Sequence, residues 1–403
     1  MDNKPLIKFF ETYMASESLF LDKKVIQSTY TPKEIPHRDK QIKQLAEILA
    51  PTLKLERPSN VFIYGKTGTG KTLSAKYTTQ QIKELAESKN LPIKVVYLNC
   101  KLKRVADTEY RLVAQLTREF GKEMPPTGLP TEEVYKIFFS TIDKEKQTIL
   151  LILDEIDQLV KKTGDEILYN LTRINEDLKN AQVSIIGISN SLTFVSDLDP
   201  RVKSSLSEEE LVFPPYNALQ IKDILLERAG QAFKKGVLEQ GLLEKCAAYA
   251  AREHGDARRA LELLRVAAEV AERENSKQVK IKHIDDADKK IENDRMLEVV
   301  KTQPKQFQAA LYSIIAISEQ RKGPIITGEA YDFYKTISTR LGLPPLTQRR
   351  ISDIISEQDM LGIINTKVIS KGRYGRTKEI SLTIPHTVLP KIKQVLGEGL
   401  DLT

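Results

Sequence analysis

The chain has 403 residues, with 62 Lys and Arg against 55 Asp and Glu, so its net charge is +7. At roughly 150 residues per domain this length predicts two or three domains, and a chain with 40% hydrophobic and 29% charged residues is neither collagen, coiled coil nor wholly disordered. Two cysteines and four scattered histidines give no disulfide framework and no metal-ligand spacing. No apolar run approaches the ~18 residues of a membrane span, and the first residues lack the apolar core of a signal peptide. We therefore expect a cytoplasmic protein that makes no membrane contact.

The first half of the chain predicts an α/β base. Residues 1–30 form an amphipathic leader of mixed charge, and a proline-containing loop then enters a helix near residue 40. From there to about residue 200, short apolar runs alternate with helical patterns. Runs that are nearly continuous in apolar residues are typical of strands buried on both faces, and strands separated by helices are typical of a parallel sheet. The predicted strands are Asn60–Tyr64, Ile93–Asn99, Thr148–Leu153 and Gln182–Ser189.

A phosphate-binding loop follows the first of these strands. The segment from Gly65 to Thr72 fits the pattern GxxxxGK[ST], and it lies between a strand and a helix, as this motif requires. Glycines let the loop curl so that backbone N–H groups point at phosphate oxygens. Lys71 would lie near the β- and γ-phosphates of ATP or ADP, and Thr72 would offer its hydroxyl to Mg²⁺. The predicted nucleotide-binding residues of this loop are Gly68, Thr69, Gly70, Lys71, Thr72 and Leu73.

Polar residues end two of the later strands. Asp154 and Glu155 follow the third strand; Asp154 would hold Mg²⁺ through water and Glu155 would polarise the attacking water. We expect Asp157 to be a helix N-cap or a solvated carboxylate. Asn190 follows the fourth strand, where it is either a turn residue or a ligand for the same water or the γ-phosphate.

The second half predicts a helical subdomain and a smaller α+β domain. Pro214 and Pro215 break the chain, and the sequence from there to about residue 290 is helical in pattern. The remainder predicts three helices and then a strand, a Gly-containing turn and a second strand, which is the winged-helix pattern. Its third helix carries Ile351, Ile354 and Ile355 on one side, with Thr347 as N-cap. The predicted elements are helices Gln303–Gln320, Glu329–Leu341 and Thr347–Met360 and strands 363–370 and 377–384.

The excess positive charge lies in this last domain. Residues 295–403 hold 16 Lys and Arg against 10 Asp and Glu, a net charge of +6 out of the total of +7. Such a concentration suits DNA binding, because phosphate neutralisation releases counterions. On the third helix Gln348, Arg349, Ser352 and Ser356 lie away from the isoleucine face and could enter the major groove. Arg350 could instead pair with Asp353, one turn further on. The turn between the strands, with Lys371, Arg373, Tyr374 and Arg376, would suit the minor groove.

The whole pattern resembles a known family. The phosphate loop, the strand ending in Asp-Glu, the strand ending in Asn and the helical segment after them look like an AAA+ ATPase. Closer still is the resemblance to the archaeal origin-recognition replication initiators, carried by YTPKEIPHRDKQI at 30–42, LDEID at 153–157, DPRVKSSL at 199–206, FPPYNALQIKDILLERA at 213–229 and HGDARRALELLR at 254–265. We therefore expect an AAA+ base at 1–212, a helical lid at 213–294 and a winged-helix DNA-binding domain at 295–403.

The resemblance implies roles for further residues. Arg258 matches the lid arginine that touches the γ-phosphate, and its alternative role is an ion pair with Glu262. Arg201 matches an arginine finger for a neighbouring subunit, and its alternative role is a structural salt bridge. Pro36, His37 and Arg38 match the loop around the adenine, while Tyr216 and Arg228 match lid residues that close over the nucleotide. An insert that touches DNA in the family corresponds here to the basic segment with Lys101, Arg104 and Arg111.

The function that the resemblance implies is ATP-dependent initiation of DNA replication at the nucleoid. ATP binding and slow hydrolysis would act as a switch, which makes the chain a weak ATPase. Its expected partners are double-stranded origin DNA, paralogous initiator subunits and the replicative helicase. Two alternatives remain open: a clamp-loader-type ATPase, which the wing disfavours, and a signalling NTPase whose winged helix contacts protein, which the +6 concentration disfavours.

Overall fold

The computed structural model describes Met14 and residues 17–27, 30–32, 34–101, 108–125, 128–194, 198–206, 209–320, 323–370, 376–385 and 388–401. It divides into two compact units, Met1–Ile284 and Asp285–Thr403. The division falls inside helix α13 (Ile281–Thr302), between Ile284 and Asp285. The boundary predicted from the sequence, between residues 294 and 295, lies further along the same helix. Each unit has its own hydrophobic core.

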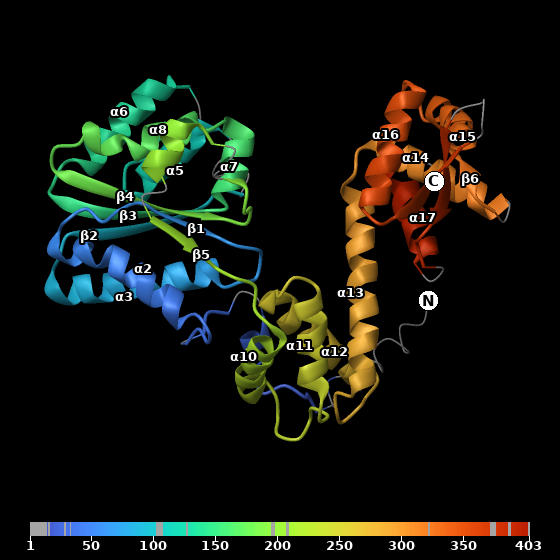
Figure 1. Ribbon diagram of the computed structural model, residues 1–403, viewed down its shortest axis with the longest axis horizontal. Coiled ribbons are helices and arrows are strands. Elements are labelled where there is room, and N and C mark those ends of the chain that lie inside the picture. Colours follow the sequence, from blue (N-terminus) through green and yellow to red (C-terminus); the bar gives the residue numbers. More distant parts are fainter. Residues whose placement is uncertain are drawn as a thin grey trace. The chain divides into compact units, whose positions relative to one another are not determined.

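A five-stranded parallel sheet forms the base of the first unit (Figure 1). The α/β class is therefore confirmed, and the four predicted strands match observed ones to within a residue at each end. The fifth strand was not predicted, because its sequence is short and begins with two glutamates, yet it pairs in parallel with the first strand at the edge of the sheet. In the spatial order β2-β3-β4-β1-β5, the strands are β1 (Val61–Tyr64), β2 (Ile93–Asn99), β3 (Gln147–Asp154), β4 (Ala181–Ser189) and β5 (Glu209–Val212).

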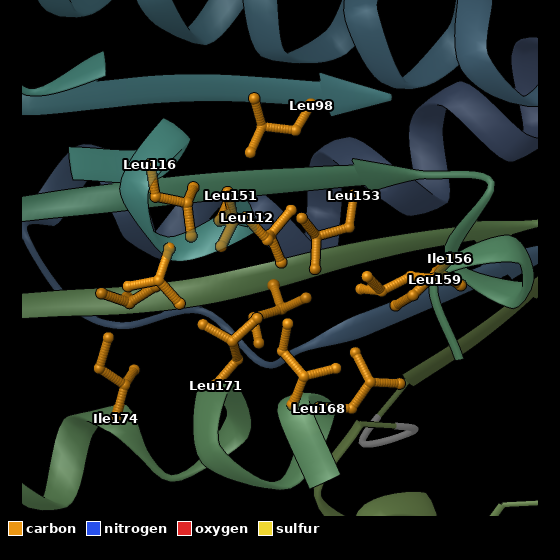
Figure 2. Packing of buried hydrophobic residues seen from close by; sticks show 14 of the residues in the cluster. Leu98, Leu112, Leu116, Leu151, Leu153, Ile156, Leu159, Leu168, Leu171 and Ile174 are labelled. Atoms are coloured by element: carbon orange, nitrogen blue, oxygen red, sulfur yellow. The ribbon is translucent and has the colours of Figure 1, made fainter. Parts of the chain in front are cut away.

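Helices cover both faces of this sheet, as Figure 1 shows. Successive side chains of a strand point to opposite faces, and in β3 Leu150 and Ile152 belong to one apolar cluster whereas Leu151 and Leu153 belong to the other. Figure 2 shows the second cluster, in which leucines of β3 lie among leucines of α5 and α8. The base helices are α2 (Asp39–Leu49), α3 (Lys71–Lys89), α5 (Glu109–Glu119), α6 (Thr131–Ile142), α7 (Ile156–Thr163), α8 (Glu166–Thr172) and α9 (Pro200–Leu206), with short 3₁₀ turns η2 (Ala50–Lys54) and η3 (Ile174–Glu176).

The lid of the first unit consists of α10 (Ala218–Ala232), α11 (Leu242–Arg252) and α12 (Ala257–Arg273). Residues 17–27, which we call the strap, pack on it and include the 3₁₀ turn η1 (Lys23–Ile26). The rings of Phe20 and Phe233 lie 4.9 Å apart, and Leu19 N donates to Glu272 Oε1 at 2.9 Å. The described part of the leader is thus an element of the lid core.

The second unit has the predicted winged-helix order. Its elements are α14 (Lys305–Gln320), β6 (Ile325–Ile326), α15 (Thr327–Arg340), α16 (Gln348–Met360), β7 (Ile364–Ser370), β8 (Arg376–Leu382) and α17 (Leu389–Gly399). The predicted N-cap is confirmed, since the Thr347 side chain accepts from Arg350 N. Ile351, Ile354 and Ile355 are buried, as the pattern indicated. We did not predict β6, which adds a two-residue edge to the hairpin, or α17, which packs against α14.

Candidate functional site

The phosphate loop leaves the carboxyl end of β1 and enters α3. Gly68 and Gly70 have φ of 69° and 88°, a left-handed backbone that favours glycine. A Cβ on Gly68 would lie 1.7 Å from Asp256 Oδ1 of the lid, and one on Gly70 would lie 2.9 Å from the Tyr216 hydroxyl. These glycines therefore serve the close approach of the lid as well as the curl of the loop.

Lys71 is the first residue of α3 and is almost fully buried. Its Nζ donates to the carbonyl oxygens of Gly65 and Lys66, each at 2.7 Å, so the ammonium lies across the loop. Burial lowers the pKa of Lys71 to about 8, against the opposing effect of the Asp154 carboxylate. A negatively charged phosphate beside such a desolvated ammonium would stabilise its charged form.

Asp154, at the end of β3, lies between two hydroxyl donors. Thr72 Oγ1 donates to its Oδ2 at 2.9 Å, and the Tyr97 hydroxyl of β2 donates to the same atom at 2.7 Å. Burial and the nearby carboxylate raise the pKa of Tyr97, so the phenol stays protonated and donates. A hydroxyl and a carboxylate so close together are the hard oxygen ligands that suit Mg²⁺.

Glu155 follows with φ of 56° and leads into α7. Its carboxylate lies 3.7 Å from Lys101 Nζ. The expectation for Asp157 was wrong: it lies inside the first turn of α7, is buried, and accepts from Ser189 Oγ of β4 at 3.1 Å. Asp157 thus ties α7 to the neighbouring strand, because a buried carboxylate needs hydrogen-bond donors.

These elements surround a cavity of about 420 Å³ between base and lid. Its lining contains residues of the phosphate loop, of the ends of β3 and β4, and of the lid. His37, Arg38 and Arg201 are not among the described residues that line it. The predicted site residues that it brings together are Pro36, Gly68, Thr69, Gly70, Lys71, Thr72, Leu73, Asp154, Glu155, Asn190, Tyr216, Arg228 and Arg258.

Arg38 joins the phosphate loop to the junction of base and lid. Its Nε donates to Thr69 O at 2.8 Å and its Nη2 to Pro214 O at 2.6 Å, while the guanidinium lies 3.8 Å from the Tyr216 ring centre. Burial lowers its pKa. His37 has φ of 63°, and its Nε2 lies 3.0 Å from the Asp223 carboxylate of α10. Both residues contact the lid.

Two lid arginines face the cavity from different helices. Arg258 lies in the first turn of α12, where Asp256 caps the helix by accepting from Arg258 N at 2.8 Å. Arg228 of α10 is buried with its guanidinium 4.4 Å from the Tyr30 ring centre, and burial lowers its pKa. Within the described part of the chain, Arg228 Nη1 is a buried atom without a hydrogen-bond acceptor.

Arg201 lies on the exposed surface of α9. Its Nε and Nη2 donate to the two carboxylate oxygens of Asp199, each at 3.0 Å, and this pair lowers the pKa of Asp199 to about 2. The guanidinium also lies 5.2 Å from the Tyr169 ring centre. In the described chain Arg201 therefore makes an intramolecular ion pair.

The residues predicted to contact DNA have varied surroundings. On α16 Gln348 and Arg349 are exposed and Ser352 is half-buried. Arg350 pairs with Asp353 at 4.0 Å, as predicted. In the ATPase unit Lys101 pairs with Glu155, and Arg111 is exposed on α5. Arg376 begins β8, whereas Arg104, Lys371, Arg373 and Tyr374 lie outside the described residues.

Comparison with protein families assigns all three parts of the chain. Residues 54–194 match an AAA domain, residues 222–289 match the Cdc6 AAA+ ATPase-type lid domain, and residues 298–390 match the CDC6 C-terminal winged-helix domain. The ORC1-type DNA replication protein of Pyrococcus abyssi is 55% identical, over 94% of this chain and 91% of that protein. This chain belongs to the ORC1-type DNA replication proteins.

Other ORC1-type proteins are similar over the same extent. ORC1-type DNA replication protein 1 of Methanosarcina acetivorans is 54% identical, over 93% of this chain and 90% of that protein. The solved structure of Aeropyrum pernix ORC1 in complex with DNA is 45% identical, with a TM-score of 0.82, and covers 95% of this chain and 98% of that one. The base is thus a nucleotide-binding AAA+ fold. Over the described residues, no helix has both the length and the apolar character to span a membrane.

Sequence reasoning missed several residues around the cavity of this ORC1-type protein. Tyr97 lies two residues before the end of β2, and Asn99 at that end is in register with Asp154 of β3. A tyrosine so near the carboxyl end of the strand beside Asp154 could have been predicted as a hydrogen-bond donor to that carboxylate. The sequence contains no signal for Tyr30 or Asp256, because their contacts depend on how the strap and lid fold back onto the base.

Proposed function

We propose that this chain is an ATP-dependent initiator that binds duplex DNA of a replication origin, deforms it and helps to recruit the replicative helicase. The observation that carries the proposal is the close contact of lid and phosphate loop around one cavity, in a chain with a basic winged-helix unit. An ATPase base, residues 1–212, and a lid, 213–294, would act as the switch, and residues 295–403 would bind DNA at the nucleoid.

Each side chain of the cavity would have a defined task. Lys71 would move from the loop carbonyls to the β- and γ-phosphates, and Thr72 and Asp154 would hold Mg²⁺, which neutralises phosphate charge when bound. The 2.9 Å separation of their oxygens supports this assignment. Glu155 would polarise water, Asn190 would hold that water or the γ-phosphate, and Arg258 would contact the γ-phosphate from the lid.

Adenine recognition would fall to the other end of the cavity. Pro36 lies in its lining with Tyr216 and Arg228. His37 and Arg38 would act indirectly, since they bond to the lid and to the phosphate loop. Closure over ATP would therefore act on the junction at Pro214, whose carbonyl oxygen accepts a hydrogen bond from Arg38.

Slow hydrolysis agrees with the surroundings of Glu155. Its carboxylate lies beside the Lys101 ammonium, which would favour a conformation in which it does not act as a base. We propose that ATP binding, more than turnover, controls the initiator.

DNA contact would come from three surfaces. Gln348, Arg349 and Ser352 would read base edges in the major groove, and Lys371, Arg373, Tyr374 and Arg376 would follow the minor groove. Lys101, Arg104 and Arg111 would make a second contact from the ATPase unit. The DNA in the Aeropyrum pernix ORC1 structure, at 45% identity, supports DNA as the ligand here.

The test is DNA binding across salt concentrations, with and without ATP and Mg²⁺. We expect a steep decline of affinity with salt on any duplex, because counterions are released, and a preference for origin sequence of ~10³ or more above it. Lys71→Ala should weaken ATP binding by about 10- to 150-fold, the value of a hydrogen bond to a charged group, and should remove the ATP effect on DNA. Lys83→Ala, on the exposed side of α3, is the matched control.

Two outcomes would contradict the proposal. Normal ATP affinity of Lys71→Ala would remove the phosphate-loop assignment. Equal affinity for origin and unrelated duplexes at every salt concentration would remove the role in origin recognition.

A further inference from the structure

The turn between α15 and α16 ends the first helix and sets the direction of the second. Gly342 has φ of 65° after the end of α15, and Leu343 N donates back to Ser338 O at 2.9 Å, which terminates that helix. Pro344 and Pro345 follow and have no N–H to donate. Leu346 therefore has the one backbone N–H between Leu343 and Thr347, the N-cap of α16.

Three side chains of α14 and α15 hold this turn, and we call them the turn clasp: the buried Tyr334 and the half-buried Tyr331 and Gln306. Tyr334 is fully buried; its hydroxyl accepts from Leu346 N at 3.1 Å and donates to Gln306 Oε1. Gln306 Nε2 in turn donates to Pro344 O at 3.0 Å. The Tyr331 hydroxyl donates to Leu346 O at 3.2 Å.

The clasp satisfies polar groups that the prolines leave without backbone partners. A buried tyrosine hydroxyl needs hydrogen bonds, so its two bonds fix its position in the core. The clasp thereby reaches from α14, through Gln306, to the residue before the N-cap of α16. Gln348 and Arg349 come directly after that N-cap.

We propose that the turn clasp is a set of positioning residues that sets the aim of α16 for sequence recognition. This inference rests on the proposed function, because it takes α16 to be the helix that reads bases. Hydrogen bonds to base edges tolerate displacements of only ~0.5 Å, whereas phosphate contacts by flexible cations tolerate more. Loss of the clasp therefore lowers discrimination between sequences more than it lowers general DNA affinity.

The test is Tyr334→Phe in the full-length chain, which removes one oxygen and keeps the ring in the core. We expect the ratio of specific to non-specific affinity to fall about tenfold, within the ~5- to 150-fold that a good base contact gives. Non-specific affinity and its salt slope should stay unchanged, because phosphate contacts determine both. Tyr312→Phe, on α14 against the same core, is the matched control and should leave the ratio unchanged.

A DNA-free measurement separates this inference from the proposed function. Hydrogen exchange at the Leu346 amide should become faster in Tyr334→Phe and stay slow in Tyr312→Phe. Faster exchange with an unchanged specificity ratio would overturn the inference, and so would an equal loss of ratio in the control. A wild-type chain without sequence preference would overturn the proposed function, while the exchange result would still show whether the clasp holds the turn.

Gln306→Met gives a second variant, should the buried phenylalanine perturb folding. It removes the acceptor of Tyr334 and the donor to Pro344, and leaves both rings in place. In combination with Tyr334→Phe, its effect on the ratio should be non-additive, because the two side chains act on one turn. Additive losses would contradict a single clasp.

Discussion

Lys71 is a charged group that burial has made easy to deprotonate, with a pKa of about 8. Neighbouring phosphates would raise that pKa, since an opposite charge favours the protonated form. Near pH 7 the ammonium is mostly charged already, so ATP binding takes up almost no proton at this group. Near pH 9 the free protein has mostly lost the proton, so ATP binding has to take one up.

We therefore predict that ATP affinity is level from pH 6.5 to 7.5 and falls above pH 8, by up to about tenfold per pH unit, because one proton is coupled to binding. Calorimetry in buffers of different ionisation enthalpy should show proton uptake near pH 9 and almost none near pH 7. Lys71→Arg, whose guanidinium does not titrate in this range, should show no uptake. Equal uptake at pH 7 and pH 9 would contradict the assignment.

At the scale of elements, the strap joins the lid although almost the entire base separates them in sequence. Phe20 is buried against Phe233, whereas the adjacent Leu21 is 64% exposed. Lys23 Nζ also lies 2.8 Å from Glu269 of α12. Removing the apolar contact should therefore loosen the lid and, with it, one wall of the cavity.

Phe20→Ala is predicted to lower the free energy of unfolding of the first unit by about 3 kcal/mol, the usual cost of truncating a buried phenylalanine. Leu21→Ala, the neighbour on the exposed side, should change it by less than ~0.5 kcal/mol. Denaturant titration with probes in each unit measures both, and the winged-helix transition should not move. No loss of unfolding free energy in Phe20→Ala would show that this residue of the strap contributes no packing energy.

Much of the architecture was predictable from the sequence, because it depends on local patterns. Strands β1 to β4 are nearly continuous in apolar residues, and α16 has its N-cap and isoleucine face in one short window. The charged strand β5 was missed because its strand conformation depends on its pairing with β1, which no local pattern indicates. Asp157 was misjudged for a related reason: its partner, Ser189, belongs to another strand. The same applies to Arg38, whose burial depends on the lid.

At the scale of the molecule, Arg201 is a predicted site residue whose proposed role depends on assembly with another subunit. Its two described side-chain hydrogen bonds go to Asp199, and among the described residues it does not line the cavity of its own chain. As an arginine finger, Arg201 would have to leave Asp199 and act on another subunit's nucleotide. The proposed partnership with paralogous initiator subunits supplies such a neighbour.

Arg201→Ala is accordingly predicted to leave ATP affinity unchanged and to reduce hydrolysis at least about tenfold in the assembled state, since such fingers contribute ~10³ or more. Arg173→Ala is the matched control, because Arg173 also lies over the Tyr169 ring, 4.7 Å from its centre, and pairs with Glu176. Single-turnover hydrolysis with and without DNA measures the effect. An equal loss in the isolated monomer would argue against action in trans.

The strap also has a consequence for synthesis on the ribosome. Leu19 of the strap bonds to Glu272, which is synthesised 253 residues later. At ~5–20 residues per second, translation leaves the apolar side chains of the strap without their partners for roughly 10–50 s. The base can fold in that interval, whereas the lid has to wait for α12. Nascent chains that stall before residue 273 would therefore expose Phe20, Val25 and Ile26, a short apolar segment suited to chaperone capture.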